Sequence, residues 1–159
     1  MADSPELEAR FWKHLGDDGT VMLGADGIAP RPMTAIAEGD RAPLWFFTSS
    51  DTDLGKALDA SAGIAGVASF AAKDHDLFAT VSGELAADSD RDVIDRLWNP
   101  FIAAWFEGKD DPKLRLLRMD TAEAHVWLNE NSMLAGAKLL LGVDPKESYK
   151  DKAGNVDLQ

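Results

Sequence analysis

Apolar residues near the start of the chain follow the spacing of an amphipathic helix. Leu7, Phe11 and Leu15 recur at every fourth position, so their side chains share one helical face. Ser4-Pro5 precedes this stripe, and a serine N-cap followed by a first-turn proline is a typical helix start. Gly16 follows the last apolar position, as at many helix ends. The pattern predicts a first helix from Ser4 to Gly16.

Short runs of apolar, β-branched and aromatic residues dominate the chain from there to residue 128. Such runs favour strands because these side chains fit a pleated, half-buried surface. The predicted strands are 20–23, 31–36, 44–49, 63–71, 77–85, 113–119 and 124–128. The turns between them predict three hairpins, which pair 31–36 with 44–49, 63–71 with 77–85, and 113–119 with 124–128. Gly83 is expected to mark a β-bulge.

Four further helical pieces are predicted between or after these strands. Residues 54–58 form a short helix capped by Thr52 or Asp53. A helix capped by Asp88 or Ser89 carries apolar residues from 93 to 98, and Asn99-Pro100 interrupts it before a second piece over 101–106. Residues 132–141 have helical character, and we expect 143–159 to be a loosely packed tail or to drape over a partner.

Strands joined by tight turns, with helices only between some of them, favour a mainly β fold. We predict an antiparallel β-barrel with peripheral helices rather than a parallel α/β sheet. The 159 residues are enough for one hydrophobic core, and we find no internal repeat or linker. The chain is therefore expected to form a single domain over 1–159.

The amino-acid composition excludes or disfavours several kinds of site and partner. The chain has no cysteine, so thiolate metal sites, disulfides and cysteine nucleophiles are excluded. A formal net charge of -12 disfavours binding to nucleic acid, whose phosphates would be repelled. We find neither a signal segment nor an apolar run long enough to span a bilayer, so we expect a cytoplasmic protein that binds no membrane.

Common catalytic motifs are missing from the sequence. It has no phosphate-binding Gly-Lys-Ser/Thr loop, no Gly-x-Gly-x-x-Gly, no Gly-x-Ser-x-Gly and no His-Glu-x-x-His. His14, His75 and His125 lack the spacing of metal ligands, so we expect no metal site. No residue stands out as a catalytic acid, base or nucleophile.

One group of residues could bind an anion. Arg31 on one predicted strand and Lys56 on a short helix offer positive charge to a phosphate, and Thr48 and Ser49 on the next strand offer hydroxyl groups. The backbone of 33–34 could lie along a planar ring. The alternative is that Arg31 and Lys56 are ordinary solvent-facing charges and that the Thr-Ser run is only the exit turn of a strand.

Several motifs resemble one known family. Arg31-Pro-Met-Thr34, the strand Leu44-Trp-Phe-Phe-Thr48 and the following lysine are similar to the flavin-binding half of the pyridoxamine-phosphate-oxidase-like split barrel. Leu97-Trp-Asn-Pro100 and Ala104-Trp-Phe-Glu-Gly-Lys-Asp-Asp-Pro112 are similar, in order and spacing, to the general stress protein 26 branch. Further matches are 114–118, 124–127, Gly142 and 154–156, so the resemblance covers most of the chain.

The resemblance implies a split β-barrel that dimerises around flavin mononucleotide (FMN), with FAD as the alternative flavin. It places Arg31 and Lys56 at the phosphate, Arg31 to Thr34 along the ring and ribityl chain, and Phe47 in the adjoining wall. Trp98 and Trp105 would contact the flavin from the second subunit, or they would only pack in the core or the dimer. The implied cofactor-binding residues are Arg31, Pro32, Met33, Thr34, Phe47, Thr48, Ser49, Lys56, Trp98 and Trp105.

Two departures from pyridoxamine-phosphate oxidase itself argue against vitamin B6 oxidation. Ile36 stands where that enzyme has a lysine, and the arginine-rich C-terminal segment that grips its substrate is missing. The resemblance then implies a flavin-dependent oxidoreductase linked to the stress response. The alternatives are a non-catalytic flavin reservoir or redox sensor, and an interaction module without flavin. Relatives that use haem or deazaflavin leave those cofactors open as well.

Overall fold

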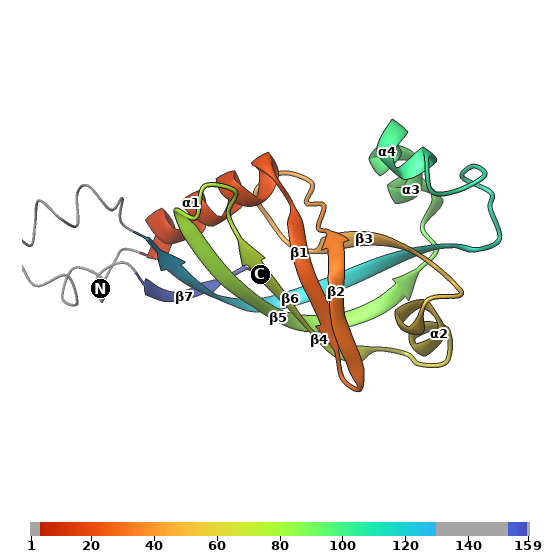
Figure 1. The fold of residues 1–159 in the computed structure, drawn as a ribbon, viewed down its shortest axis with the longest axis horizontal. Helices are drawn as coiled ribbons and strands as arrows, with labels where there is room; N and C mark the ends of the chain where they lie inside the picture. The colour runs from red at the N-terminus through yellow and green to blue at the C-terminus, as the bar shows by residue number, and fades with distance from the viewer. Residues whose placement is uncertain (1–3, 130–152, 159) are drawn as a thin grey trace, which may run out of the picture.

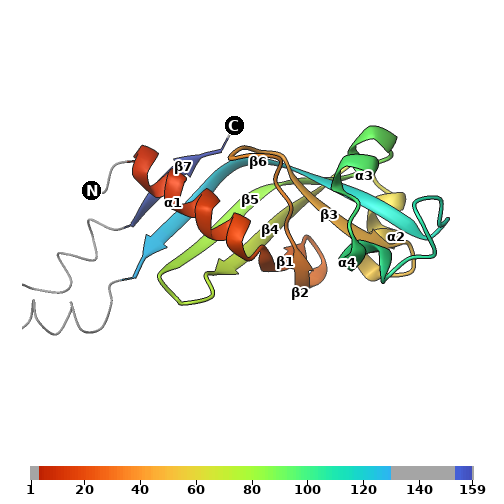
Figure 2. The same cartoon turned by 90° about the horizontal axis from the view of Figure 1, so that it is seen from above.

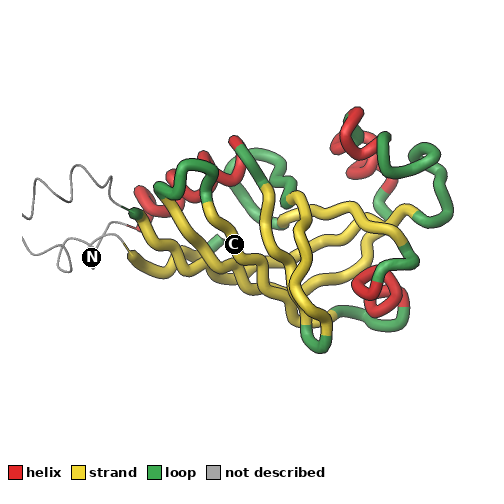
Figure 3. The backbone as a smooth tube through the Cα atoms, viewed as in Figure 1, coloured by secondary structure: helices red, strands yellow, loops and turns green. Residues whose placement is uncertain are grey.

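The computed structural model describes residues 4–129 and 153–158. It is a strongly curved antiparallel sheet with helices at its periphery, so the predicted mainly β fold class is confirmed (Figures 1 and 3). The elements in chain order are α1 Ser4–Asp17, β1 Thr20–Ala25, β2 Ile28–Thr34, β3 Leu44–Ser49, α2 Asp53–Asp59, β4 Ile64–Ala71, β5 Leu77–Asp88, α3 Arg91–Leu97, α4 Pro100–Ala103, β6 Leu114–Leu128 and β7 Ala153–Asp157.

The strands follow the order β2-β1-β4-β5-β6-β3, and β7 pairs with the far end of β6. This leaves β2 and β3 at the two ends of the path. The sheet curls so that these ends approach, and among the described residues they are joined by the β-bridge between Ile36 and Trp45. Both backbone hydrogen bonds of this bridge are formed, at 2.8 and 2.9 Å. The barrel is thus split along the rest of the β2–β3 line.

Most of the predicted local features are confirmed. Leu7, Phe11 and Leu15 are buried as the helical stripe of α1, and β4 and β5 form the predicted hairpin. Thr52 is the N-cap of α2, and Asn99 caps α4 after the predicted interruption. The β5–β6 register shifts next to Gly83, which is the predicted bulge.

Two predicted hairpins are wrong. The partner of β2 is β1, across the turn at residues 26–27, whereas β3 pairs with β6. The predicted strands 113–119 and 124–128 are not partners either, because both fall, except for residue 113, in the continuous 15-residue strand β6, which pairs with β5 along most of its length. The polar residues near 120 resemble a turn in sequence but lie within the strand at the bulge.

Two smaller corrections concern a cap and the C-terminal segment. The N-cap of α3 is Asp90, not Asp88 or Ser89, and its carboxylate accepts a hydrogen bond from the Asp92 amide at 3.0 Å. Residues Ala153–Asp157 of the predicted tail form β7, in which Val156 is buried, and Leu158 directly after the strand is buried as well. The predicted helix at 132–141 and residues 143–152 lie outside the described residues.

The main core fills the barrel between the sheet and two helices. It combines inward residues of the strands with Leu7, Phe11 and Leu15 of α1 and with Leu54 and Leu58 of α2. A second, smaller core lies on the outer side of β3 and β6, where α3 covers them. Its buried members are Trp45, Val93, Ile94, Leu114 and Leu116. Strand β3 therefore contacts a core on each of its faces. A separate observation is that no helix in the described part of the chain is long and apolar enough to cross a membrane.

Gly83 is required by the backbone of the bulge. A Cβ built on Gly83 would lie 2.2 Å from the carbonyl oxygen of Asp120, a distance at which atoms clash. We predict that Gly83→Ala lowers the free energy of unfolding by about 1–3 kcal/mol, the usual cost of overpacking. Gly16→Ala is the control, because no atom lies within 4 Å of a Cβ there. Denaturant unfolding of both variants checks this, and equal stability of Gly83→Ala and the wild type would contradict it.

Candidate functional site

Most of the predicted flavin residues lie on β2 and β3, beyond the single bridge between the two edges. Counting back from the Ile36–Trp45 bridge in antiparallel register places Thr34 opposite Phe47, Met33 opposite Thr48 and Pro32 opposite Ser49. These residues form no ladder, so the strands diverge from the bridge. Figure 2 shows β3 running away from the β1–β2 hairpin toward α2. We call this open stretch, 31–34 of β2 with 47–49 of β3, the seam.

The seam leaves backbone groups of both edge strands without a strand partner. Each edge strand pairs on one side only, β2 with β1 and β3 with β6. Amides and carbonyls directed into the gap are therefore available to a ligand. Pro32 has no N–H and the Ser49 carbonyl already accepts hydrogen bonds from Thr52, so the seam offers a polar ligand only part of the donors and acceptors of a strand edge.

Side-chain direction places Arg31 on the inner side of the seam. Arg31 pairs with Leu23 and Met33 with Val21, and both of these partners are buried in the main core. Directly paired residues share a face of the sheet, so Arg31 and Met33 project inward. Met33 packs against the core, whereas Arg31 is exposed because the barrel is open at this point.

Thr48 and Ser49 are held by a hydrogen-bond network at the start of α2. The Thr52 hydroxyl donates to the carbonyl of Ser49 at 2.8 Å and accepts from the Gly55 amide at 3.0 Å. Its hydrogen is therefore used, so in the 3.1 Å contact between the two hydroxyls Thr48 must be the donor. Thr48 is buried. The Ser49 hydroxyl donates to the carboxylate of Asp51.

Asp51 places a negative charge near the predicted phosphate site. Its hydrogen bond from Ser49 holds the pKa of this carboxyl below its usual value, and the ammonium of Lys113 lies 3.4 Å from it. The carboxylate therefore stays ionised but is partly balanced by Lys113. An anion bound near Ser49 needs additional positive charge, which only Arg31 and Lys56 among the predicted residues can supply.

Arg31 and Lys56 form no ion pair with any described residue, as is also true of Lys13, Arg41 and Lys73. Most other described cations are paired with carboxylates, namely Arg10, Arg91, Arg96, Lys109, Lys113, Arg115 and Arg118. Lys56 is exposed on α2, whose Gly55 packs against the backbone of Ser49 and Ser50. The helix that carries Lys56 is thus fixed directly to the end of β3.

The two predicted tryptophans occupy different positions. Trp98 is half-buried and packs edge-on against Phe47, with ring centroids 6.4 Å apart, so it contacts the seam within its own chain. Trp105 is 84% exposed, and Phe101, four residues earlier, is 83% exposed. Phe106 packs against the second core and Ile102 is buried, while Phe101 and Trp105 are exposed. Phe101 was not among the predicted site residues, and α4 ends at Ala103, before Trp105.

A separate cleft offers little free charge. It has a volume of about 450 Å³ and lies between the end of α2, α3 and the start of β6, with Asp59, Arg91, Lys109 and Arg115 among its lining residues. Arg115 pairs with Asp59 at 2.9 Å, Arg91 with Asp110 at 2.7 Å and Lys109 with Asp95 at 3.2 Å. None of the predicted flavin residues lines it. The seam, with its unpaired cations and backbone groups, is the better anion site.

Comparison with known proteins gives consistent matches. The family model described as pyridoxamine 5'-phosphate oxidase like matches residues 6–147. Among curated proteins, none matches the chain.

Three solved structures are similar over most of the chain. A general stress family protein from Xanthomonas campestris is 54% identical, covers 83% of this chain and 93% of its own, and has a TM-score of 0.76. The general stress FMN/FAD binding protein from Xanthomonas citri is 52% identical over 80% of this chain and 92% of its own, also at a TM-score of 0.76. A general stress protein 26 from Jannaschia is 25% identical, covers 98% of this chain and 99% of its own, and has a TM-score of 0.80.

The Thr52 network yields a prediction about the seam. We expect Thr52→Ala to lower the free energy of unfolding by about 1 kcal/mol, the typical value of an N-cap, because the Gly55 amide loses its acceptor. Thr52→Ser keeps the hydroxyl and should stay close to the wild type. Thermal or denaturant unfolding measures the difference, and equal destabilisation by alanine and serine would show that the hydroxyl network is not the cause.

Proposed function

The chain belongs to the pyridoxamine 5'-phosphate oxidase-like family, and on this basis we propose that it binds a flavin, FMN, in the seam between β2 and β3. The observation that carries the proposal is the seam itself, an open strand edge beside two cations, Arg31 and Lys56, that pair with no described carboxylate. The similar Xanthomonas citri protein, described as an FMN/FAD binding protein, supports the choice of a flavin.

Each predicted residue has a role in this proposal. Arg31 and Lys56 bind the phosphate, and the hydroxyls of Thr48 and Ser49 assist once their hydrogens turn from Thr52 and Asp51 toward it. The backbone of 31–34 binds the polar edge of the ring system, and Phe47 forms the adjoining wall. Arg31 presents a planar fork that suits phosphate oxygens, whereas Lys56 acts as a point charge.

A bound flavin supplies one- and two-electron transfer chemistry. The protein supplies binding and orientation, because the described seam residues 31–34 and 47–49 include no histidine or carboxylic acid that could transfer a proton. We therefore propose a flavin-dependent oxidoreductase in which the flavin carries the reaction. The alternative is a flavin reservoir or redox sensor, which binds equally well but does not oxidise reduced nicotinamides faster than free flavin does.

We also propose that the chain forms a homodimer and that the exposed Trp105 of each subunit approaches the flavin of the other, whereas Trp98 stays against Phe47 of its own chain. Support comes from the outer face of the sheet, where Met22, Val67 and Phe78 are 43%, 44% and 38% exposed. The outward positions of β1 and β4 carry no charged residue, although the whole chain has a net charge of -12. An uncharged face lets two acidic chains associate without strong repulsion.

Flavin binding is tested with FMN, riboflavin and three proteins. We predict that Arg31→Ala weakens FMN binding by about 10- to 100-fold, the usual value of a charge-assisted hydrogen bond, and riboflavin binding much less, because riboflavin has no phosphate. Lys73→Ala is the matched control, since Lys73 is also an unpaired, exposed cation but lies on the turn between β4 and β5.

Flavin fluorescence titration gives the dissociation constants. A wild type that binds neither FMN nor FAD at micromolar concentrations would overturn the proposal. Equal loss of FMN and riboflavin binding in Arg31→Ala would overturn the phosphate role of Arg31 alone.

The dimer is tested by a charge on the sheet face. We predict a wild-type mass of about twice 17.2 kDa in light scattering, and a shift of Val67→Asp toward the single-chain mass, because the new carboxylate would have to be desolvated in the interface. Ala9→Asp adds the same charge to the exposed side of α1 and should remain dimeric. A monomeric wild type, or a Val67→Asp variant as dimeric as the control, would contradict this interface.

A further inference from the structure

The connection from β2 to β3 is held by few contacts. Ala35 donates its amide hydrogen to Gly19 at 2.8 Å, and Ile36 makes the bridge to Trp45. Beyond the bridge, residues 37–43 lead back to β3. Within 37–43, Glu38 alone uses its side chain in a hydrogen bond or ion pair to a described residue. Ala37 and Ala42 also pack, partly buried, against the main core, so Glu38 supplies the one polar side-chain contact of this described connection.

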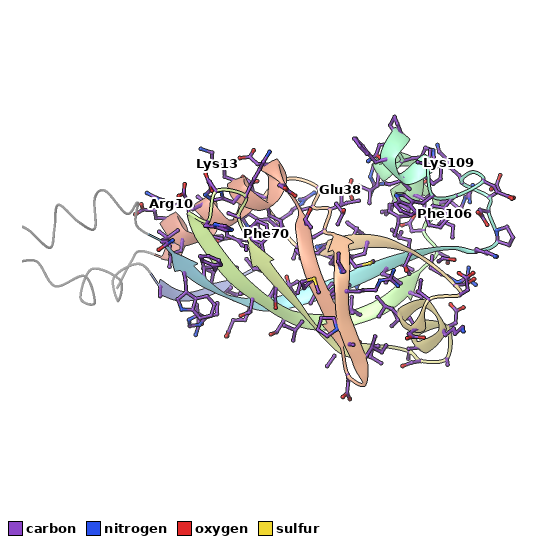
Figure 4. The ribbon with its side chains drawn as sticks, in the orientation of Figure 1. Arg10, Lys13, Glu38, Phe70, Phe106 and Lys109 are labelled. Carbon is purple, nitrogen blue, oxygen red and sulfur yellow. The ribbon has the colours of Figure 1, made fainter. Side chains whose placement is uncertain are left out.

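Glu38 is bound by Arg96 in a two-pronged contact. Arg96 donates from Nε and Nη2 to the two carboxylate oxygens of Glu38, at 2.8 and 2.9 Å. A bidentate contact of this kind fixes direction as well as distance. It also holds the pKa of the Glu38 carboxyl below its usual value, so the pair is ionised at neutral pH. Figure 4 shows Glu38 between the barrel and the segment that carries α3 and α4.

Arg96 is itself fixed to β3. It lies in the last turn of α3, and Val93 and Ile94 of that helix pack in the second core against Trp45 of β3. The ion pair therefore ties the chain leaving β2 to a helix that rests on β3. Because Glu38 follows the bridge residue Ile36 by two positions, a change at Glu38 moves the point from which the two strands diverge.

We propose that the Glu38–Arg96 ion pair is a positioning contact that sets the opening of the seam and hence the affinity for the flavin. The inference rests on the proposed function for its ligand. Neither residue touches the seam residues 31–34 and 47–49 through a described hydrogen bond, so both act through the bridge and through α3. Residues 58 positions apart in sequence thus control one ligand site.

The test compares Glu38→Gln with the matched control Glu6→Gln. Glu6 and Arg10 form an exposed ion pair within α1, with 3.0 Å between Arg10 Nη2 and Glu6 Oε1. This pair is separated in sequence from the seam residues 31–34 and 47–49. Glu38→Gln keeps the size of the side chain and removes its charge. We expect it to weaken FMN binding by about three- to fivefold, the upper range for a partly exposed ion pair, and Glu6→Gln to leave binding unchanged. The exchange Glu38→Arg with Arg96→Glu should restore the affinity to within about twofold.

A second readout works without flavin. The amides of Ile36 and Trp45 form the bridge, so hydrogen exchange at these two amides reports its stability directly. We expect faster exchange at both in Glu38→Gln than in the wild type and in Glu6→Gln, whereas amides in the β4–β5 hairpin should not change. A contact that only stabilises the whole fold would accelerate exchange in all of these places.

The outcomes separate the two proposals. If the wild type binds no flavin, the proposed function fails, and with it the link from the ion pair to affinity. If the wild type binds FMN but Glu38→Gln binds it equally tightly, or if bridge amides exchange at the wild-type rate in that variant, the positioning role is overturned while the proposed function stands.

Discussion

The proposed site depends on the incomplete closure of the barrel between β2 and β3. The sheet curls until β2 and β3 meet, yet the described residues form only the Ile36–Trp45 bridge between them. A continued ladder would have consumed the edge groups of 31–34 and 47–49 and buried Arg31. The open seam instead leaves backbone donors and acceptors beside unpaired positive charge, which an acidic chain needs if it is to bind an anion.

The second core explains how a split barrel stays rigid at its open edge. An edge strand with one paired side is normally the weakest part of a sheet. Here β3 packs on both faces, with Phe46 in the main core and Trp45 in the second core under α3. Phe47 and Trp98 extend this packing to the seam. Side-chain packing therefore stabilises β3 along the edge where β3 has no backbone partner. The seam can stay open while β3 remains well packed.

The sequence predicted local features well and long-range ones poorly, for physical reasons. The helical stripe of α1, the Thr52 cap and the bulge at Gly83 depend on neighbouring residues, so their patterns are visible in the chain. The partners of β2 and β3 depend on how the whole sheet curls, and no short sequence pattern records that curvature. Because 31–36 and 44–49 are neighbours in sequence, they were predicted to pair, whereas β2 pairs with β1 and β3 with β6. The resemblance to a family singled out residues of β2 and β3 whose role stays a prediction, whereas the Glu38–Arg96 pair required the three-dimensional structure.

The central claim, that the seam holds a phosphate-bearing flavin, is tested most directly by a crystal structure of the protein with FMN. The account predicts flavin density between β2 and β3, with the phosphate contacted by Arg31 and Lys56 and with β2 and β3 still joined at Ile36 and Trp45. Density in the cleft lined by Arg91 and Arg115, or a seam closed by a continuous β2–β3 ladder, would contradict it.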